Sequence, residues 1–141
     1  MSDNPKYFLD TNIVVYAYDW HEPQKMDIAR QILRQGMSEE NAVLSPQVLG
    51  EFFVVVTKKI KAPFSPEAAL EVIETLGLLS AVEMDHQLVV KATNIHIRYN
   101  ISYWDGLIVA AAERAGCSTL LTEDLKQGEI YNGVKVDNPF N

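Results

Sequence analysis

Short apolar runs with strand character alternate along the chain with longer stretches whose apolar positions recur at helical spacing. The predicted strands cover residues 6–10, 42–45, 80–84, 118–124 and 134–137. The predicted helices cover residues 12–18, 23–36, 46–60, 65–79, 85–99 and 102–116. Because such alternation needs right-handed crossover connections, it predicts a three-layer α/β/α fold with a central, mostly parallel sheet of about five strands.

Several predicted helices carry recognisable end signals. Ser45 is followed by a proline, which is the arrangement of an N-cap and a proline at the first helical position. Ser65 and Ser102 are the predicted caps of two later helices. Gly36 and Gly116 are predicted to end the helices that precede them, since glycine readily adopts the left-handed conformation found there.

The totals are those of an ordinary globular protein. A length of 141 residues suits one domain, so we expect residues 1–141 to form a single unit. Cys117 is the only cysteine, so no internal disulfide can form, which fits a reducing compartment. No apolar run approaches the ~20 residues that span a bilayer, and the N-terminus lacks a signal-peptide pattern. We therefore expect a cytoplasmic protein without membrane contact.

The charge balance bears on possible partners. The formal net charge is −7, which argues against a nucleic-acid partner because phosphates attract positive surface. The objection weakens if several acids are gathered around divalent cations, because part of the negative charge then belongs to metal ligands. The three histidines are scattered along the chain, so a zinc site is not expected.

Four acids stand where the apolar pattern does not lead one to expect a charge. Asp10 ends the first predicted strand, and Asp124 closes the fourth. Glu51 is the lone charge in an apolar stretch of the helix after the second strand, and Asp105 is alone in the first turn of another apolar helix. Because ligands bind beyond the carboxyl ends of parallel strands, all four acids can converge at one edge of the sheet.

Each acid also has a purely structural interpretation. Asp10 could cap the following helix, Asp105 could complete a Ser-x-x-Asp capping box with Ser102, and Asp124 could be a turn residue. Glu51 is harder to explain in this way, because a buried carboxylate needs a partner and no cation lies close to it in the sequence.

The four acids together favour a metal site over four separate structural roles. Two carboxylates ~4 Å apart repel by about 4 kcal/mol at an effective dielectric constant near 20, so a cluster of four requires compensation. Hard cations such as Mg²⁺ and Mn²⁺ prefer sites made of oxygen atoms. Ions of this kind can activate water and stabilise the leaving oxygen of a phosphodiester.

Other acids and a histidine near these positions are given structural roles. Asp85 and Asp137 also follow predicted strands, but we place both strands at sheet edges. Asp85 is interpreted as a helix cap and Asp137 as a surface residue. Glu123 should point away from the side of Asp124, because neighbouring side chains alternate along an extended backbone. His96 is interpreted as a packed helix residue and not as a catalytic base.

Basic and aromatic residues offer further candidate contacts. The one basic cluster consists of Lys58, Lys59 and Lys61, and a solvated helix end is favoured over contact with phosphates. Tyr103 and Trp104 directly precede Asp105 and could stack on a base. Packing in the core is the expected role of both aromatic residues.

Four motifs in order resemble the PIN-domain ribonucleases, and within that family the VapC-type toxins of toxin–antitoxin pairs. The motifs are "FLDTN", Glu51 after "LSPQVLG", "SYWDGLIVAAA" and "LLTEDL", and the match runs from Tyr7 to about Val136. The resemblance implies a PIN-like α/β/α fold with a metal-dependent endoribonuclease site. It also implies a homodimer, an RNA substrate and a small antitoxin protein that inserts a segment into the active-site groove.

The resemblance also assigns roles to individual residues. It implies that the family's Mg²⁺ or Mn²⁺ ligands correspond to Asp10, Glu51, Asp105 and Asp124. In the family, the polar residue matching Asn12 braces the first aspartate, and the one matching Thr122 helps to hold the site.

Two other interpretations were weighed. A phosphatase of the haloacid-dehalogenase type needs a second acid two residues after the first, and Asn12 stands in that place. No Ser-His or Cys-His arrangement and no glycine-rich phosphate loop stands out, so water is the expected nucleophile. A catalytically inactive PIN-like module that binds RNA or protein stays open as the alternative.

Overall fold

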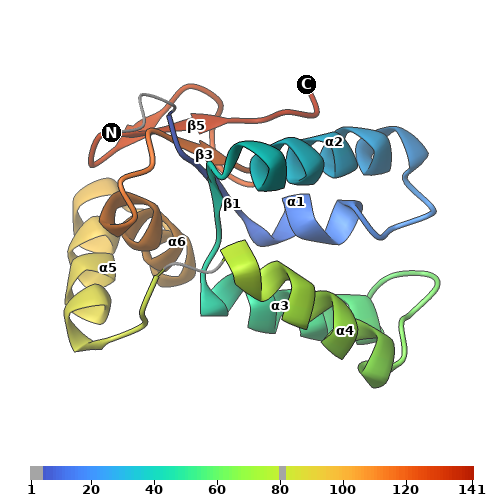
Figure 1. The fold of residues 1–141 in the computed structure, drawn as a ribbon. Coiled ribbons are helices and arrows are strands. Elements are labelled where there is room, and N and C mark those ends of the chain that lie inside the picture. Colours follow the sequence, from blue (N-terminus) through green and yellow to red (C-terminus); the bar gives the residue numbers. More distant parts are fainter. Residues whose placement is uncertain (1–4, 80–81) are drawn as a thin grey trace.

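Five strands form one sheet at the centre of the molecule, in the order β2-β1-β3-β5-β4 (Figure 1). Their bounds are Tyr7–Leu9 for β1, Ala42–Val43 for β2, Thr119–Leu121 for β3, Ile130–Tyr131 for β4 and Val134–Asp137 for β5. Every neighbouring pair is parallel except β4 and β5, which are antiparallel. This computed structural model describes residues 5–79 and 82–141.

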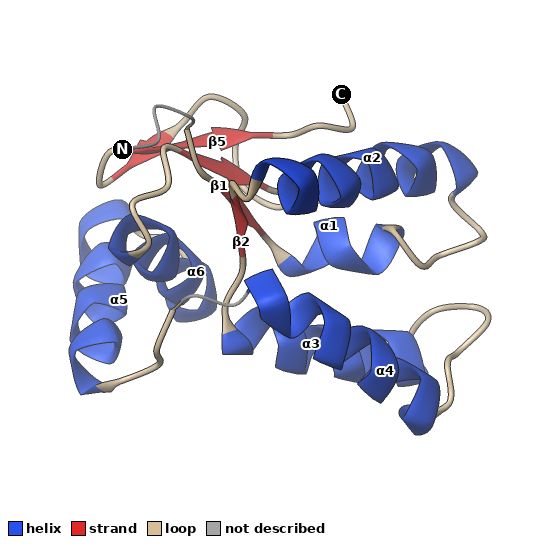
Figure 2. Cartoon of the chain, viewed as in Figure 1, coloured by secondary structure: helices blue, strands red, loops and turns tan. Residues whose placement is uncertain are grey.

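Helices flank this sheet on both sides, as the alternating pattern predicted (Figure 2). They are α1 (Thr11–Tyr16), α2 (Pro23–Glu39), α3 (Pro46–Lys58), α4 (Pro66–Leu76), the short 3₁₀ helix η1 (Gly77–Leu79), α5 (His86–Tyr99) and α6 (Tyr103–Arg114). The α5–α6 pair lies on one side and packs through α6 on β3 and β5, while α2 packs on β2 (Figure 1). The predicted α/β/α class with a mostly parallel sheet is confirmed.

The core lies between the strands and the helices that cover them. Phe8, Leu9, Leu120 and Val136 come from the three central strands, and each is almost completely buried. Strands covered on both faces are apolar without alternation, and burial of each such side chain contributes about 1.5–3 kcal/mol. Among the described residues, no helix has both the length and the apolar character needed to cross a membrane.

The predicted strand at residues 80–84 is wrong over residues 82–84, which have no regular secondary structure. Residues 80 and 81 lie outside the described part of the chain. The fifth strand of the sheet is instead β4. Asn132 and Gly133 connect β4 to β5, and their φ angles are 49° and 83°. An Asn-Gly pair between apolar residues is a strong hairpin signal, so the sequence did contain the information for this strand.

The hairpin also changes the position of Asp137. Because β5 lies between β3 and β4, the predicted edge position of its strand is wrong. The Asp137 side chain is half-buried and accepts a hydrogen bond of 3.1 Å from Gln127 Nε2.

The predicted end of α2 at Gly36 is also wrong, because the helix continues for three more residues. A Cβ atom at position 36 would clash with the Cβ of Ala42, so glycine is needed there for the close approach of α2 to β2. Glu40 ends the helix with a left-handed φ of 56°.

Most of the other end signals are confirmed. Asp85, Ser65 and Ser102 each accept a hydrogen bond from the amide three residues further on. Gly116 adopts a left-handed φ of 75° just after α6. Ser45 occupies the cap position of α3, but its side chain makes no capping hydrogen bond.

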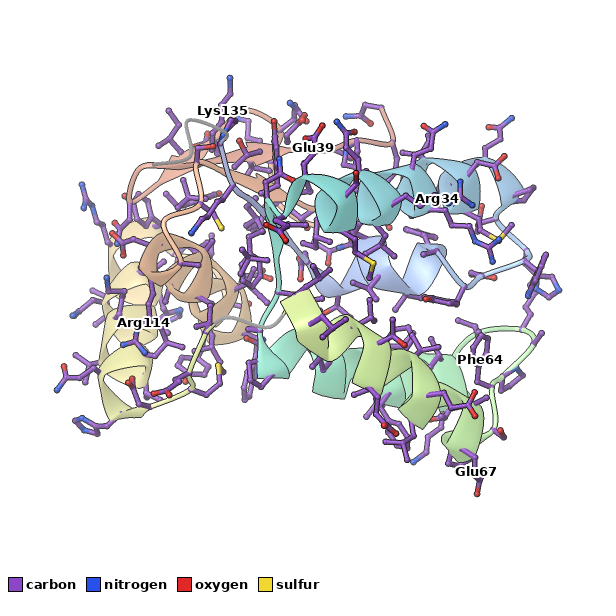
Figure 3. The ribbon with its side chains drawn as sticks, in the orientation of Figure 1. Arg34, Glu39, Phe64, Glu67, Arg114 and Lys135 are labelled. Carbon is purple, nitrogen blue, oxygen red and sulfur yellow. The ribbon has the colours of Figure 1, made fainter. Side chains whose placement is uncertain are left out.

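The α5–α6 pair is held tightly, which fixes the start of α6. A Cβ atom at Gly106 would lie 2.8 Å from the Ala92 carbonyl oxygen, so the two helices approach closely only because residue 106 is glycine. Arg114, labelled in Figure 3, pairs with Asp85 at 2.9 Å. These contacts determine where the first turn of α6, with its acid, meets the sheet.

Candidate active site

Four acids from four separate segments meet at the carboxyl edge of the sheet. Asp10 follows β1, and Asp124 follows the neighbouring strand β3, while Glu51 lies in α3 and Asp105 in the first turn of α6. The negative charges of Asp124 and Glu51 raise the pKa values of both Asp10 and Asp105. Asp124 and Glu51 are therefore near enough to both Asp10 and Asp105 for their charges to add to the larger effect of burial.

Asp10 is the most deeply buried of the four, with 4% of its surface exposed. Its carboxylate caps α1 by accepting a hydrogen bond of 2.7 Å from the Thr11 amide, and Thr122 Oγ1 donates to it at 2.8 Å. Burial is the largest cause of a rise in its pKa to about 6, which the two hydrogen bonds oppose. Asp10 is thus a helix cap and a member of the acid cluster at the same time.

Glu51 is half-buried and has partners within the chain. Thr11 Oγ1 donates to its Oε1 at 2.6 Å, and Gln47 Nε2 donates to its Oε2 at 3.4 Å. The sequence offers no cation near Glu51, and its partners are instead a hydroxyl 40 residues away and an amide on the preceding turn of α3. The two contacts satisfy the carboxylate without neutralising its charge.

Asp105 is half-buried at the N-terminal end of α6. Its amide donates to Ser102 Oγ at 3.0 Å, which is the cap half of the predicted capping box. Burial raises the pKa of its carboxyl group most, the hydrogen bond from Ser102 lowers it, and the charges of Asp124 and Glu51 raise it further.

Thr122 links the first and last of the four acids. Its hydroxyl donates to Asp10 and accepts hydrogen bonds from the Asp124 amide at 3.0 Å and from Asn12 Nδ2 at 3.2 Å. Asn12 Nδ2 also donates to Asp124 Oδ2 at 3.0 Å. Thr122 therefore takes the place beside Asp10 that we expected of Asn12, and Asn12 holds the exposed Asp124 instead.

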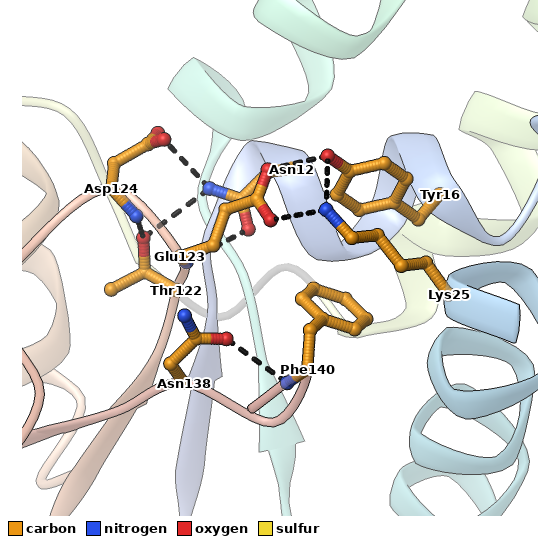
Figure 4. A network of polar contacts seen from close by, with 8 residues as sticks. All are labelled: Asn12, Tyr16, Lys25, Thr122, Glu123, Asp124, Asn138 and Phe140. Atoms are coloured by element: carbon orange, nitrogen blue, oxygen red, sulfur yellow. Dashed lines mark hydrogen bonds and ion pairs between the residues drawn. The ribbon is translucent and has the colours of Figure 1, made fainter. Parts of the chain in front are cut away.

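Glu123 turns away from Asp124, as predicted from the alternation of side chains (Figure 4). Its carboxylate accepts a hydrogen bond from the Tyr16 hydroxyl and pairs with Lys25 Nζ at 3.0 Å. Lys25 also donates to Tyr16 at 3.2 Å, and the Glu123 amide donates to Asn12 at 3.3 Å. This network anchors the segment after β3 to α1 and α2, and no local pattern in the sequence indicated it.

A second contact missed at the sequence level joins α3 to α6. Gln47 Nε2, which reaches Glu51, also lies 3.3 Å from the main-chain oxygen of Trp104. Tyr103 is half-buried and packs against the core, as expected. Trp104 is 62% exposed, so the prediction that it packs in the core is wrong. His96 is also exposed, contrary to its predicted packing.

Two neighbouring cavities adjoin the acids. One of about 320 Å³ is lined by Asn12 and Asp124, and the other, of about 380 Å³, is lined by Glu51 and Lys59. Both are also lined by Thr11, so they adjoin on either side of it. The lysines at 58, 59 and 61 are exposed, as predicted for a solvated helix end.

The donor chemistry of the four acids fits a hard divalent cation. All four side chains offer carboxylate oxygens, the donors that such an ion prefers, and the side-chain groups that donate to Asp10, Glu51 and Asp124 are neutral hydroxyls and amides. Within residues 5–79 and 82–141, no three acidic, histidine or cysteine groups lie close enough together to hold one ion. The side-chain positions in the described residues therefore do not by themselves form a complete metal site.

Solved structures with a similar fold include the DNA-bound VapBC from Salmonella typhimurium, which is 21% identical with a TM-score of 0.66. That match covers 96% of this chain and 99% of the other. VapBC2 from Rickettsia felis, bound to a promoter fragment, is 21% identical with a TM-score of 0.63 and coverages of 94% and 97%. VapC20 from Mycobacterium tuberculosis, described as a Sarcin-Ricin loop cleaving toxin, is 16% identical with a TM-score of 0.57 and coverages of 82% and 87%.

Sequence comparison identifies the family independently of these structures. No curated protein matches the chain. The profile of the PIN domain, however, matches residues 7–133, which is most of the chain and includes all four acids. The chain therefore belongs to the PIN-domain family.

Proposed function

We propose that this protein is a metal-dependent endoribonuclease that hydrolyses RNA phosphodiester bonds, and that it is the toxin of a type II toxin–antitoxin pair. The observation that carries the proposal is that Asp10 and Asp105, from the end of β1 and from α6 of a PIN domain, both lie within the electrostatic reach of Asp124 and Glu51. The names of the similar structures support it, since two are VapBC complexes and one is a toxin that cleaves the Sarcin-Ricin loop.

In this proposal the catalytic residues are Asp10, Glu51, Asp105 and Asp124, which would hold Mg²⁺ or Mn²⁺. When bound, such an ion lowers the pKa of water and stabilises negative charge on a phosphodiester. The buried position of Asp10 strengthens its electrostatic interactions, because the local dielectric constant is lower than in water.

The remaining polar side chains orient the acids. The hydrogen bonds run from Thr122 to Asp10, from Thr11 to Glu51 and from Asn12 to Asp124. Each donor is a hydroxyl or an amide, so it fixes a carboxylate oxygen without neutralising the charge that a cation requires. Asn12 and Thr122 are therefore proposed as supporting residues.

The partners in this proposal are an RNA substrate, a cognate antitoxin protein and a second copy of the chain in a homodimer, all in the cytoplasm. Lys59 lines the cavity beside Glu51, which supports a contact between this lysine and an RNA phosphate. The two VapBC complexes among the similar structures support an antitoxin as partner.

The test is cleavage of a broad panel of RNAs by the purified protein with Mg²⁺ or Mn²⁺. We expect cleavage by the wild type, loss of cleavage on chelation, and loss of cleavage in Asp10→Asn. Asp27→Asn is the matched control, since Asp27 is an exposed aspartate on α2 outside the cluster, and it should cleave like the wild type.

The alternative is a PIN-like module that binds RNA or protein without cleaving it. The observation that favours it is that no three potential ligands among the described residues converge on one point. RNA binding by a folded wild type that cleaves nothing in the panel with either metal would support this module and contradict the nuclease.

A further inference from the structure

The chain has two tryptophans, and both are largely exposed. Trp20 is 65% exposed, and Trp104 is 62% exposed. Trp20 lies in the connection between α1 and α2, where the Arg30 guanidinium carbon is 5.3 Å from its ring centroid. Trp104 lies in the first turn of α6, directly before Asp105, and Figure 1 shows helix α6 on the opposite side of the fold from the α1–α2 connection. Of the two, Trp104 is the one adjacent to the acid cluster and without a cation stacked on its ring in the described structure.

The main chain of Trp104 is fixed beside the acids. A single nitrogen, Gln47 Nε2, is 3.3 Å from the Trp104 main-chain oxygen and 3.4 Å from Glu51 Oε2. The ring of Tyr103 meets the indole edge-to-face, with centroids 5.0 Å apart, and Tyr103 itself packs against the core. The main chain that carries the exposed indole is therefore linked through Gln47 to Glu51, and the indole itself contacts the ring of Tyr103.

The surroundings of this indole suit a nucleobase better than a phosphate. The net charge is −7, and Asp105 directly follows Trp104, so direct attraction of a phosphate by protein side chains is not favoured at this position. Stacking on an aromatic ring does not depend on positive charge, and every base offers a face for it. Ser102, Asp105 and Gln47 place polar groups beside the main chain of Trp104, while its indole contacts the aromatic ring of Tyr103.

We propose that Trp104 is a stacking platform for an unpaired nucleobase of single-stranded RNA, next to the acid cluster. The proposal rests on the proposed function in taking RNA as the ligand, but it concerns binding and not cleavage. Stacking on Trp104 then contributes to affinity and sets which nucleotide lies beside the four acids.

The test measures the affinity of a fluorescently labelled single-stranded RNA of about 12 nucleotides for Asp10→Asn protein, which cannot cleave it under the proposed mechanism. Adding Trp104→Ala should weaken binding about tenfold, and Trp104→Tyr should restore most of the affinity. Adding Trp20→Ala, the matched change of an equally exposed tryptophan, should leave the affinity unchanged. Equal affinity with and without Trp104, or loss of affinity in the Trp20 variant alone, would overturn the proposal.

Tryptophan fluorescence gives a second measurement that does not depend on affinity. Trp20→Phe leaves Trp104 as the only tryptophan, and a stacked base should quench its emission when RNA is added. Trp104→Phe leaves Trp20, whose emission should not change. Quenching confined to Trp20 would contradict the stacking platform.

The outcomes separate this inference from the nuclease proposal. Tryptophan-dependent RNA binding by a protein that never cleaves RNA would support the platform and contradict the nuclease. If the wild type cleaves RNA but Trp104→Ala leaves the RNA affinity unchanged, the nuclease proposal is supported and the stacking platform is contradicted. If Trp104→Ala instead turns a dimer into a monomer in light scattering without changing RNA affinity, the indole belongs to a protein interface, and the platform is refuted.

Discussion

Carboxylates on the α5–α6 pair and carboxylates at the carboxyl edge of the sheet have different partners. On the helix pair away from the cluster, Asp85 lies 2.9 Å from Arg114 and Glu113 lies 2.8 Å from Lys91, so each of these two acids has a cation. At the sheet edge, the partners of the acids are hydroxyls and amides. These bonds satisfy the oxygens but leave the repulsion between the charges in place.

The contrast shows that the helix pair and the acid cluster have opposite effects on the stability of the folded state. Ion pairs and a close glycine contact hold α5 to α6, and both features lower the free energy of the folded state. The acid cluster raises that free energy, since burial and like charge raise the pKa values of Asp10 and Asp105. Arrangements that destabilise the folded state are expected at functional sites, because binding a ligand can require them.

The largest effect in this comparison should come from the pH dependence of Asp10. The pKa of this carboxyl group is about 6 in the folded protein against 3.8 in the unfolded chain, so the folded state binds the proton more tightly. The stabilising effect of this tighter proton binding is complete below pH 3.8 and is lost as the pH rises through about 6. The free energy of unfolding should fall by about 3 kcal/mol at most over this range. Urea unfolding of wild type and Asp10→Asn in metal-free buffer measures it, and only the wild type should show this loss.

Addition of millimolar Mn²⁺ at pH 7 should restore the lost stability in the wild type and not in Asp10→Asn, because an ion that binds the folded state stabilises it. A wild-type pH profile that coincides with that of the variant would contradict the destabilising role of this charge.

The next effect in size tests the packing of the helix pair. Gly106→Ala places a methyl group 2.8 Å from the Ala92 carbonyl oxygen, so we expect a loss of about 2 kcal/mol in urea unfolding. Gly50→Ala is the matched control, since nothing lies within 4 Å of the added atom in α3 and alanine favours the helix. It should stabilise the protein by up to about 1 kcal/mol. Equal effects of the two changes would refute the close approach of α5 and α6.

The smallest effect compares two acids on the same helix. At pH 7, Asp105→Asn should increase the free energy of unfolding, because the raised pKa means that the folded protein disfavours this charge. Glu113→Gln should decrease it, because the change removes the pair with Lys91. Both changes should be below about 1 kcal/mol, since the groups are partly exposed and screened by solvent. If both variants change the free energy of unfolding in the same direction, the distinction between the acid cluster and the helix pair is contradicted.

Much of the fold and the positions of the acids could be predicted from local patterns. Strand and helix periodicity located the elements, and the rule that ligands bind at the carboxyl ends of parallel strands brought Asp10 and Asp124 to the same edge. The errors came where a local signal had two meanings. Gly36 could end a helix or allow close packing, and an aromatic residue such as Trp104 could be core or surface.

The sequence by itself determined the helices and most of the strands, because these depend on periodicity and end signals within a few residues. It also determined that lone acids stand at the ends of strands and in the first turns of helices. Only the tertiary structure decided how those acids are held, because Thr122 and Asp10 are 112 residues apart, and Lys25 and Glu123 are 98 apart. Partners so distant in sequence are neighbours only because the sheet places β1 beside β3, and the direction of each side chain decides its hydrogen bonds.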